Sequence, residues 1–381
     1  MNLRKLSDIV DLLKGKKPEI STNSDGNLPY LTAKYIRGES DPKYGIPNSK
    51  GSVLVCPDEY VIIMDGSNSG EVFTDLNGIL ASTMGKIVLK EKINQKYLGY
   101  FLESNKKLFS RTKTGSAIPH LSKEVFFNLE IPVPSLAKQE KIVQKLDKSF
   151  SNIDKLIKNS EKNIEDIKSL FNSFLSDIFS SNQSEDLIQL DSLSTYISRG
   201  LQPKYSDKSE TLVINQRCIR DNKVNFEVGR YHDQNLKKVA EDKKIQIGDI
   251  LINSTGVGTL GRVAQVTELP NNDVTVDTHV TIFRPDFNIL SKEFSNWLFV
   301  YLQNLIEKMG VGASGQTELR RADLQNMKII NPPNIKIQQG ISEKLDNLKI
   351  PYDNYLRLKK DLVIKYSMLK NSILDYEFSH E

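Results

Sequence analysis

The side chains that could perform chemistry in this chain do not form a catalytic set. The four histidines and two cysteines are scattered, and no spacing typical of a zinc site occurs. No P-loop, nucleophile elbow or nuclease-like carboxylate cluster is present either. Asp277 and His279 could share one face of a strand, and such a pair is typical of a structural contact. The sequence therefore predicts a protein that is not an enzyme and that needs no metal or cofactor.

Two motifs suggest cofactor chemistry but lack the context that it requires. Gly256–Gly261 spells GxGxxG, and a dinucleotide site needs a helix directly after the glycines. Arg262–Val266 instead has the character of a strand, so we predict a glycine-rich β-hairpin, with an equivalent at Ile62–Val72. Asn331–Asn334 reads Asn-Pro-Pro-Asn, without the aromatic fourth residue with which amino-methyltransferases stack a flipped base. We interpret its prolines as the break before a helix.

Polar and basic loops are the remaining candidates for function. Examples are Lys34–Arg37 in the first half of the chain and Gln216–Arg220 in the second. Side chains of these types read base edges and hold phosphates in protein–DNA complexes. An ordinary solvated surface is the alternative interpretation of any one loop, but recurrence at equivalent places in two halves favours nucleic-acid binding.

The elements that must position these loops occur twice, with a period near 200 residues. Tyr97–Leu102 matches Trp297–Leu302 at a separation of 200 residues. The clearest match follows a proline in each copy, where three pairs lie 199 residues apart: Gln139 and Gln338, Ile142 and Ile341, Leu146 and Leu345. A repeat of this length indicates a duplicated domain rather than a solenoid.

Each copy contains a mixed part followed by a long helix. Short β-like runs and one helix, about 94–110 or 291–309, are expected in the mixed part. Apolar residues then follow a heptad pattern from Val143 to Ile178, with Ser160 as the one polar position, and Pro351 predicts a break or kink near Ile350 in the second copy. We predict an α+β protein with two similar mixed α/β domains, 1–134 and 187–332, and two long helices, 135–181 and 333–377. The simplest partner for each helix is the other one within the chain, and a homo-oligomeric coiled coil is the alternative.

Composition limits the class of protein and its compartment. The 381 residues carry a net charge of +4, with 38% hydrophobic and 26% charged residues, which excludes a disordered chain. Such a mild charge allows DNA as a partner without requiring it. No signal-peptide core and no apolar run of membrane-spanning length occurs, so we expect a cytoplasmic protein with no membrane association.

With these features the chain resembles the specificity (S) subunit of type I restriction–modification systems over essentially its whole length. The duplicated layout carries the resemblance, together with a strand–turn–strand signature at Asp249–Gly256 and a Pro-x-Pro, Gln-Glu helix start within Ile131–Ile142. A Gly-Ser/Ala loop before Leu121 and Leu319 adds to it. The second copy departs from the family pattern at three positions: Gln339, Gly340 and Pro351.

The resemblance implies a fold, a mechanism and a set of partners. Two target-recognition domains would each read one half of a split double-stranded DNA site, and the long helices would pack as an antiparallel coiled coil that spaces them. Two methyltransferase (M) subunits, and restriction (R) subunits in the full complex, would bind the chain, which has no chemistry of its own. A coiled-coil adaptor without DNA specificity is the alternative function, and a self-sufficient DNA methyltransferase is a weaker one.

Candidate DNA-binding residues follow from the polar loops and this resemblance. For the first half-site they are Lys34, Arg37, Ser67, Lys113 and Ser116. For the second half-site they are Arg217, Arg220, Ser254, Gln316 and Arg320.

Overall fold

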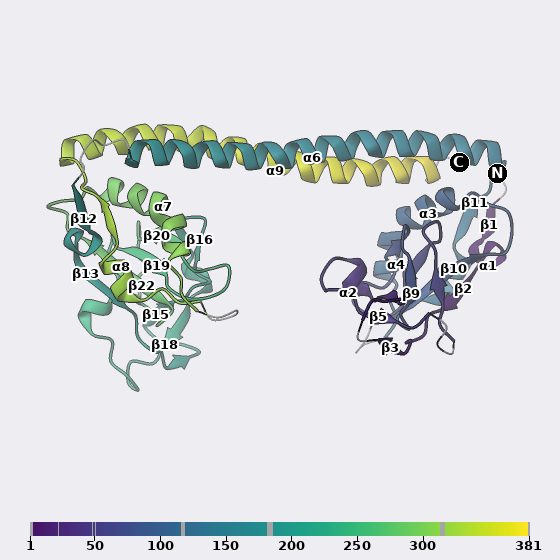
Figure 1. Ribbon diagram of the computed structural model, residues 1–381, viewed down its shortest axis with the longest axis horizontal. Coiled ribbons are helices and arrows are strands. Elements are labelled where there is room, and N and C mark those ends of the chain that lie inside the picture. The colour runs from purple at the N-terminus through teal and green to yellow at the C-terminus, as the bar shows by residue number, and fades with distance from the viewer. Residues whose placement is uncertain are drawn as a thin grey trace. The chain divides into compact units, whose positions relative to one another are not determined.

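The computed structural model describes residues 3–21, 23–47, 49, 51–115, 119–180, 186–312 and 317–379. The chain forms two compact units, whose elements are labelled in Figure 1. One unit contains Met1–Lys162 and Lys359–Glu381, and the other contains Asn163–Leu358. Each unit therefore combines one mixed domain with a stretch of each long helix.

Two helices of 45 residues, α6 (Leu136–Ser180) and α9 (Ile335–Ser379), follow the mixed domains. In the first unit, apolar side chains from the start of α6 share a cluster with Leu374 near the end of α9. In the second unit, Phe171 near the end of α6 stacks on Tyr352 of α9, with ring centroids 4.3 Å apart. The start of one helix meets the end of the other in both units, which confirms the predicted antiparallel pairing within the chain.

The buried stripe of α6 shifts by one residue along the helix. Val143, Leu146 and Ile153 are buried as the heptad pattern predicts, whereas Phe174 is 38% exposed and Leu175 is 2% exposed. A straight α-helix drifts by about 20° per heptad relative to a strict 3.5-residue repeat. Over four heptads this drift amounts to about 80°, which is close to the rotation of about 100° between consecutive residues of a helix. Leu175 therefore takes the buried position that the heptad pattern predicts for Phe174.

Of the break or kink predicted near Ile350, the break is absent, because α9 continues through Pro351. Proline removes one backbone N–H donor and crowds the preceding turn, which costs a helix interior about 3 kcal/mol. Packing compensates at this point, since the neighbouring Tyr352 stacks on Phe171 of α6. Tertiary contacts therefore override the local preference of the sequence.

Within its described residues, the first domain contains a four-stranded sheet, a five-stranded sheet, a two-stranded sheet and five short helices. Its elements are β1 (Leu3–Lys5), α1 (Leu6–Ile9), β2 (Val10–Lys14), β3 (Ile20–Ser21), β4 (Leu28–Leu31), α2 (Ala33–Ile36), β5 (Tyr44–Gly45), β6 (Leu54–Val55), β7 (Val61–Ile63), β8 (Val72–Phe73), β9 (Gly78–Leu80), β10 (Met84–Leu89), α3 (Gln95–Ser104), α4 (Lys106–Arg111), α5 (Lys123–Asn128) and β11 (Glu130–Pro132). The sheets have the orders β2-β10-β7-β8 and β3-β5-β4-β9-β6, and β1 pairs with β11. The strands β4 and β9 are parallel.

The second domain repeats this topology. Its elements are β12 (Leu187–Gln189), β13 (Ser194–Arg199), β14 (Tyr205–Ser206), β15 (Thr211–Ile214), β16 (Ile219–Arg220), β17 (Lys223–Val224), β18 (Arg230–His232), β19 (Ile250–Asn253), β20 (Val263–Gln265), β21 (Asp273–Val276), β22 (Val280–Pro285), α7 (Lys292–Lys308), α8 (Arg321–Gln325) and β23 (Lys328–Ile330), with three short 3₁₀ turns. The sheet β13-β22-β19-β20 matches β2-β10-β7-β8, β12 pairs with β23, and β15 and β21 are parallel. The matching orders confirm the predicted duplication.

An aromatic contact fastens each mixed domain to the long helices. In the first unit, Phe378 of α9 packs on Tyr97 and Phe101 of α3, at centroid distances of 5.3 and 5.5 Å. In the second unit, Phe179 of α6 stacks on Tyr301 of α7 at 5.1 Å. The helix after the central sheet thus anchors its domain by the same face in both copies. Among the described helices, none is long and apolar enough to cross a bilayer.

Candidate nucleic-acid interface

Each domain contains a glycine-rich hairpin, next to which several of the candidate DNA-binding residues lie. The strands β7 and β8 pair antiparallel around the turn Gly66–Gly70, and β19 and β20 pair antiparallel around Gly256–Gly261. The GxGxxG sequence therefore forms the hairpin that its flanking residues predict, and no helix follows it. Asn331–Asn334 is likewise the segment that precedes α9, where Asn334 Oδ1 accepts a hydrogen bond from the Ile337 N–H at 3.1 Å.

The loop that follows α4 lies beside the first turn, and the loop that follows α7 lies beside the second turn. In the first domain, the Gly66 N–H donates to the Pro119 carbonyl at 2.8 Å, and Lys113 Nζ donates to the Ser67 carbonyl at 2.6 Å. In the second domain, the Leu319 N–H donates to the Ser254 carbonyl at 2.8 Å. The structure therefore brings the predicted residues Ser67 and Lys113 together. The other loop candidates, Ser116 and Gln316, lie outside the described residues.

The basic candidates follow the same strand in each domain. Lys34 and Arg37 lie on and just after α2, directly beyond β4, and Arg217 and Arg220 follow β15. Both strands are the ones that pair in parallel, so the two basic segments occupy equivalent places in the topology. The first segment is a helical turn, whereas the second ends in the hairpin β16–β17.

The basic side chains differ in whether they form ion pairs with other described residues. Lys34, Arg217 and Arg220 are exposed and make no ion pair with any described residue. Arg37 pairs with Glu39 at 2.8 Å and with Glu71 at 2.6 Å. Within the second domain, the candidate Arg320 instead makes a two-pronged contact with a carboxylate on its own α8, Asp323. The three unpaired residues are therefore available to an anion without losing an existing contact.

Ser254 lies in the interior rather than on the candidate surface. It is fully buried, and its hydroxyl is hydrogen-bonded to Thr281 Oγ1 at 2.6 Å. Its neighbour Asn253 is also fully buried and donates through Nδ2 to the Gln216 carbonyl at 3.0 Å. These residues hold the turn and the loop of Arg217 together, and Ser254 offers no free group to a ligand in this arrangement.

Ion pairs at the base of each hairpin hold the loop that packs on it. Asp65 accepts hydrogen bonds from His120 Nδ1 at 2.8 Å and from Lys14 Nζ at 3.2 Å. Partial burial raises the pKa of Asp65, but these two bonds outweigh it, so the net pKa of the carboxyl is lowered. In the second domain Arg199 pairs with Glu318 instead.

Lys14 and Arg199 belong to the polar and basic loops that the sequence singles out, but their ion pairs with Asp65 and Glu318 were not predicted. Lys14 and Arg199 each end the edge strand of the matching sheet, directly before a glycine. That shared position in the repeat is the signal that could have revealed them.

The second domain also contains a buried ion pair beneath its central sheet. Arg284 on β22 makes two hydrogen bonds of 2.8 Å to the carboxylate of Asp249, which is 1% exposed. The hydrogen bonds to Asp249 raise the pKa of Arg284. This pair fixes the start of β19 against β22 and therefore the position of the hairpin turn that β19 leads into.

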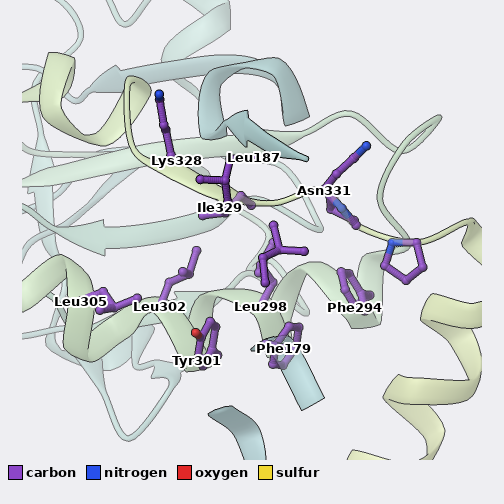
Figure 2. Close-up of a pocket in the computed structure, with 13 residues that line it drawn as sticks. Phe179, Leu187, Phe294, Leu298, Tyr301, Leu302, Leu305, Lys328, Ile329 and Asn331 are labelled. Atoms are coloured by element: carbon purple, nitrogen blue, oxygen red, sulfur yellow. The ribbon is translucent and has the colours of Figure 1, made fainter. Parts of the chain in front are cut away.

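The second unit contains a small, largely apolar cavity. It has a volume of about 140 Å³ and lies between α7, the pair β12–β23 and Phe179 at the end of α6, as Figure 2 shows. Leu298, Leu302 and Ile329 line it, and Lys328 is its one charged side chain. Among the described residues, its walls contain no carboxylate, histidine or thiol.

Comparison with known proteins identifies the family. Residues 1–166 and 201–360 match the type I restriction modification DNA specificity domain. The chain belongs to this family. Its role there is DNA sequence specificity, which agrees with the function that its loops predict. The two matched ranges correspond to the two copies of the duplicated domain, each with part of the helix that follows it.

Individual relatives extend along the whole chain. The type I restriction enzyme MjaVIII specificity subunit of Methanocaldococcus jannaschii is 26% identical over 97% of this chain and 90% of its own length. The EcoBI specificity subunit of Escherichia coli is 22% identical over 100% of this chain and 85% of its own length. A chain from a solved type I restriction–modification system has a TM-score of 0.73 over 98% of this chain and 96% of its own, at 16% identity. That last similarity supports the fold.

Proposed function

We propose that this S subunit reads a bipartite double-stranded DNA target, with one half-site bound by each recognition domain, while M subunits perform the methylation. R subunits complete the assembly where cleavage accompanies methylation. The chain itself acts without chemistry of its own, in the cytoplasm. The observation that carries this proposal is the pair of topologically equivalent surfaces, each built from a glycine-rich hairpin, its neighbouring loop and a basic segment.

The two surfaces differ in the residues and shapes that they present, and this supports an asymmetric target. The first domain presents Lys34 from a helical turn, whereas the second presents Arg217 and Arg220 from a turn and a hairpin. Arginine can bind guanine through two hydrogen bonds in the major groove, while lysine acts as a single charge. Unequal surfaces on a duplicated scaffold would therefore read two different half-sequences.

Single-molecule methylome sequencing tests this function. DNA is compared from cells that express the chain with its M subunit and from cells that express the M subunit alone. A new split motif that carries methylated bases in both halves is the expected result. If the complex forms but no new motif appears, the chain is an adaptor without DNA specificity. Methylation by the chain without any M subunit would contradict its non-catalytic role.

A further inference from the structure

The two hairpin turns share a backbone shape that their sequences do not share. Gly66 and Gly256 open the turns with φ values of 109° and 102°. Gly70 and Gly261 lie at the other ends, with φ values of 95° and 84°. A Cβ atom on Gly66 would meet nothing within 4 Å, so glycine is needed there for its backbone conformation and not for close packing.

Each turn presents two consecutive backbone N–H groups at its tip. The amides of Ser67 and Asn68, and those of Val257 and Gly258, make no backbone hydrogen bond with any described residue. Val257 is 71% exposed, so the tip of the second turn is uncovered. Successive amides that follow a residue with positive φ form a concave cluster of partial positive charge, and such clusters bind anions.

A cation is fixed at the carbonyl side of each turn, although it comes from a different place in each domain. Lys113 Nζ from the neighbouring loop donates to the Ser67 carbonyl at 2.6 Å. Arg262 Nη2, from the strand side of its own hairpin, donates to the Gly258 carbonyl at 2.6 Å. An ammonium has three N–H donors and a guanidinium has five, so both retain free donors. Two unrelated residues thus place a positive charge against a carbonyl of each turn.

Three of the acidic groups near the turns have basic partners. They form these pairs: Asp65 with Lys14 and His120, Glu71 with Arg37 and Lys106, and Glu318 with Arg199. An anion that approaches either turn would therefore meet amides that have no backbone partner among the described residues, together with a cation, while these three carboxylates are already compensated.

We propose that the two turns are matched phosphate-binding points, one for each half-site, where free amides and Lys113 or Arg262 hold the DNA backbone without reading its sequence. This inference rests on the proposed DNA-reading function and adds a division of labour to it. The turns would fix the position of the duplex, while Lys34, Arg217 and Arg220 would be free to contact base edges.

The test uses the S–M complex and measures affinity for target and non-target duplexes at several salt concentrations. Lys113→Gln and Arg262→Gln each remove one positive charge. Each should weaken both duplexes by the same factor, several-fold at low salt, and reduce the slope of log affinity against log salt by about 0.9. Lys123→Gln and Lys328→Gln are the matched controls, because they remove exposed charges from α5 and β23 instead.

Phosphate ethylation interference provides a second measurement, which starts from the wild-type complex and does not rely on the salt dependence of affinity. One ethylated phosphate in each half-site should impair binding of the wild-type complex, and the corresponding variant should lose that sensitivity. A variant that changes the preferred sequence, or that keeps the wild-type slope and interference pattern, overturns the inference. If the wild-type complex itself fails to distinguish target from non-target DNA, the proposed function fails instead, so the two failures can be told apart.

Discussion

The Gln338 side chain on α9 closes the start of α7, because its Oε1 accepts a hydrogen bond from the Ser291 N–H at 2.7 Å. Its Nε2 donates to the carbonyls of Ile289 and Pro333 at 2.8 and 2.7 Å. Gln139 on α6 does the same in the other unit, accepting from the Asn94 N–H at 2.9 Å. The glutamine that identified the repeat is thus a clamp between a recognition domain and its long helix.

Replacing Gln338 with alanine should destabilise the second unit. The side chain is fully buried, and its loss leaves one buried N–H and two carbonyls without their partner. We expect the free energy of unfolding to fall by about 2–3 kcal/mol, measured by urea denaturation. The exposed neighbour allows a control, Gln339→Ala, which should change stability by less than about 0.5 kcal/mol. Equal effects of the two changes would contradict a clamp.

Breaking the buried pair between Arg284 and Asp249 should be more costly. Arg284→Met leaves the Asp249 carboxylate, which is 1% exposed, without its two-pronged partner. We expect a loss of about 3–5 kcal/mol in the free energy of unfolding. The double variant Arg284→Met, Asp249→Leu should recover part of this loss, since it removes the isolated charge. No recovery in urea denaturation would show that the cost lies in packing alone.

The Asp65 ion pairs predict a dependence of stability on pH. The pKa of Asp65 is lowered in the folded chain, so its contribution is present above the ordinary carboxyl pKa and is lost as the pH falls through the lowered value. Asp65→Asn should therefore be less stable than wild type above the ordinary carboxyl pKa of about 4, and the two urea midpoints should converge as the pH falls below that range. A difference that stays constant over this range would contradict the assignment.

Pro351 should weaken α9, although the helix continues through it. Pro351→Ala restores the missing backbone donor, and we expect the free energy of unfolding to rise by about 1–3 kcal/mol. Ile350→Ala, at a neighbouring position that is 64% exposed, should have little effect. An unchanged or lower urea midpoint for Pro351→Ala would show that the helix is shaped around the proline.

Arg217 provides a prediction about recognition. It is exposed and unpaired among the described residues, so Arg217→Ala should leave stability unchanged. If it reads a base, the variant should lose about 1–3 kcal/mol of binding to the cognate duplex and should relax one position in the second half-site. Affinity titrations of cognate and altered duplexes with the S–M complex measure the loss of binding, and methylome sequencing measures the change in the motif. An unaltered motif together with a uniform loss over all sequences would make Arg217 a phosphate contact.

The sequence predicts elements whose determinants are local or repeated. The hairpin at Gly256–Gly261 could be predicted because strand-like residues flank the glycines, and the helix α7 because the stretch 291–309 matches the helical stretch 94–110 of the first copy. The long helices could be predicted because the apolar heptad pattern continues over five heptads. In each case neighbouring residues or the matching copy contain the information.

The features that the sequence did not predict depend on contacts between residues that are far apart in the chain. Lys14 and Asp65 lie 51 residues apart, so their pairing depends on the order of strands in the sheet. Ser254 has the composition of a surface residue, but the paired strands β19 and β22 bury its hydroxyl against Thr281. The continuity of α9 through Pro351 depends on a contact with a helix almost 200 residues earlier. A single sequence contains no local record of these contacts.

The contact of Phe378 with α3 has a consequence for biosynthesis. Residues Lys359–Glu381 complete the unit that contains the first recognition domain, whereas Asn163–Leu358 is a continuous stretch. During translation the second unit therefore has all of its residues before the first one does. The face of α3 that includes Tyr97 and Phe101 must wait for Phe378, which is translated after the whole of the second unit. The domain that is made first is thus the last to obtain its full core.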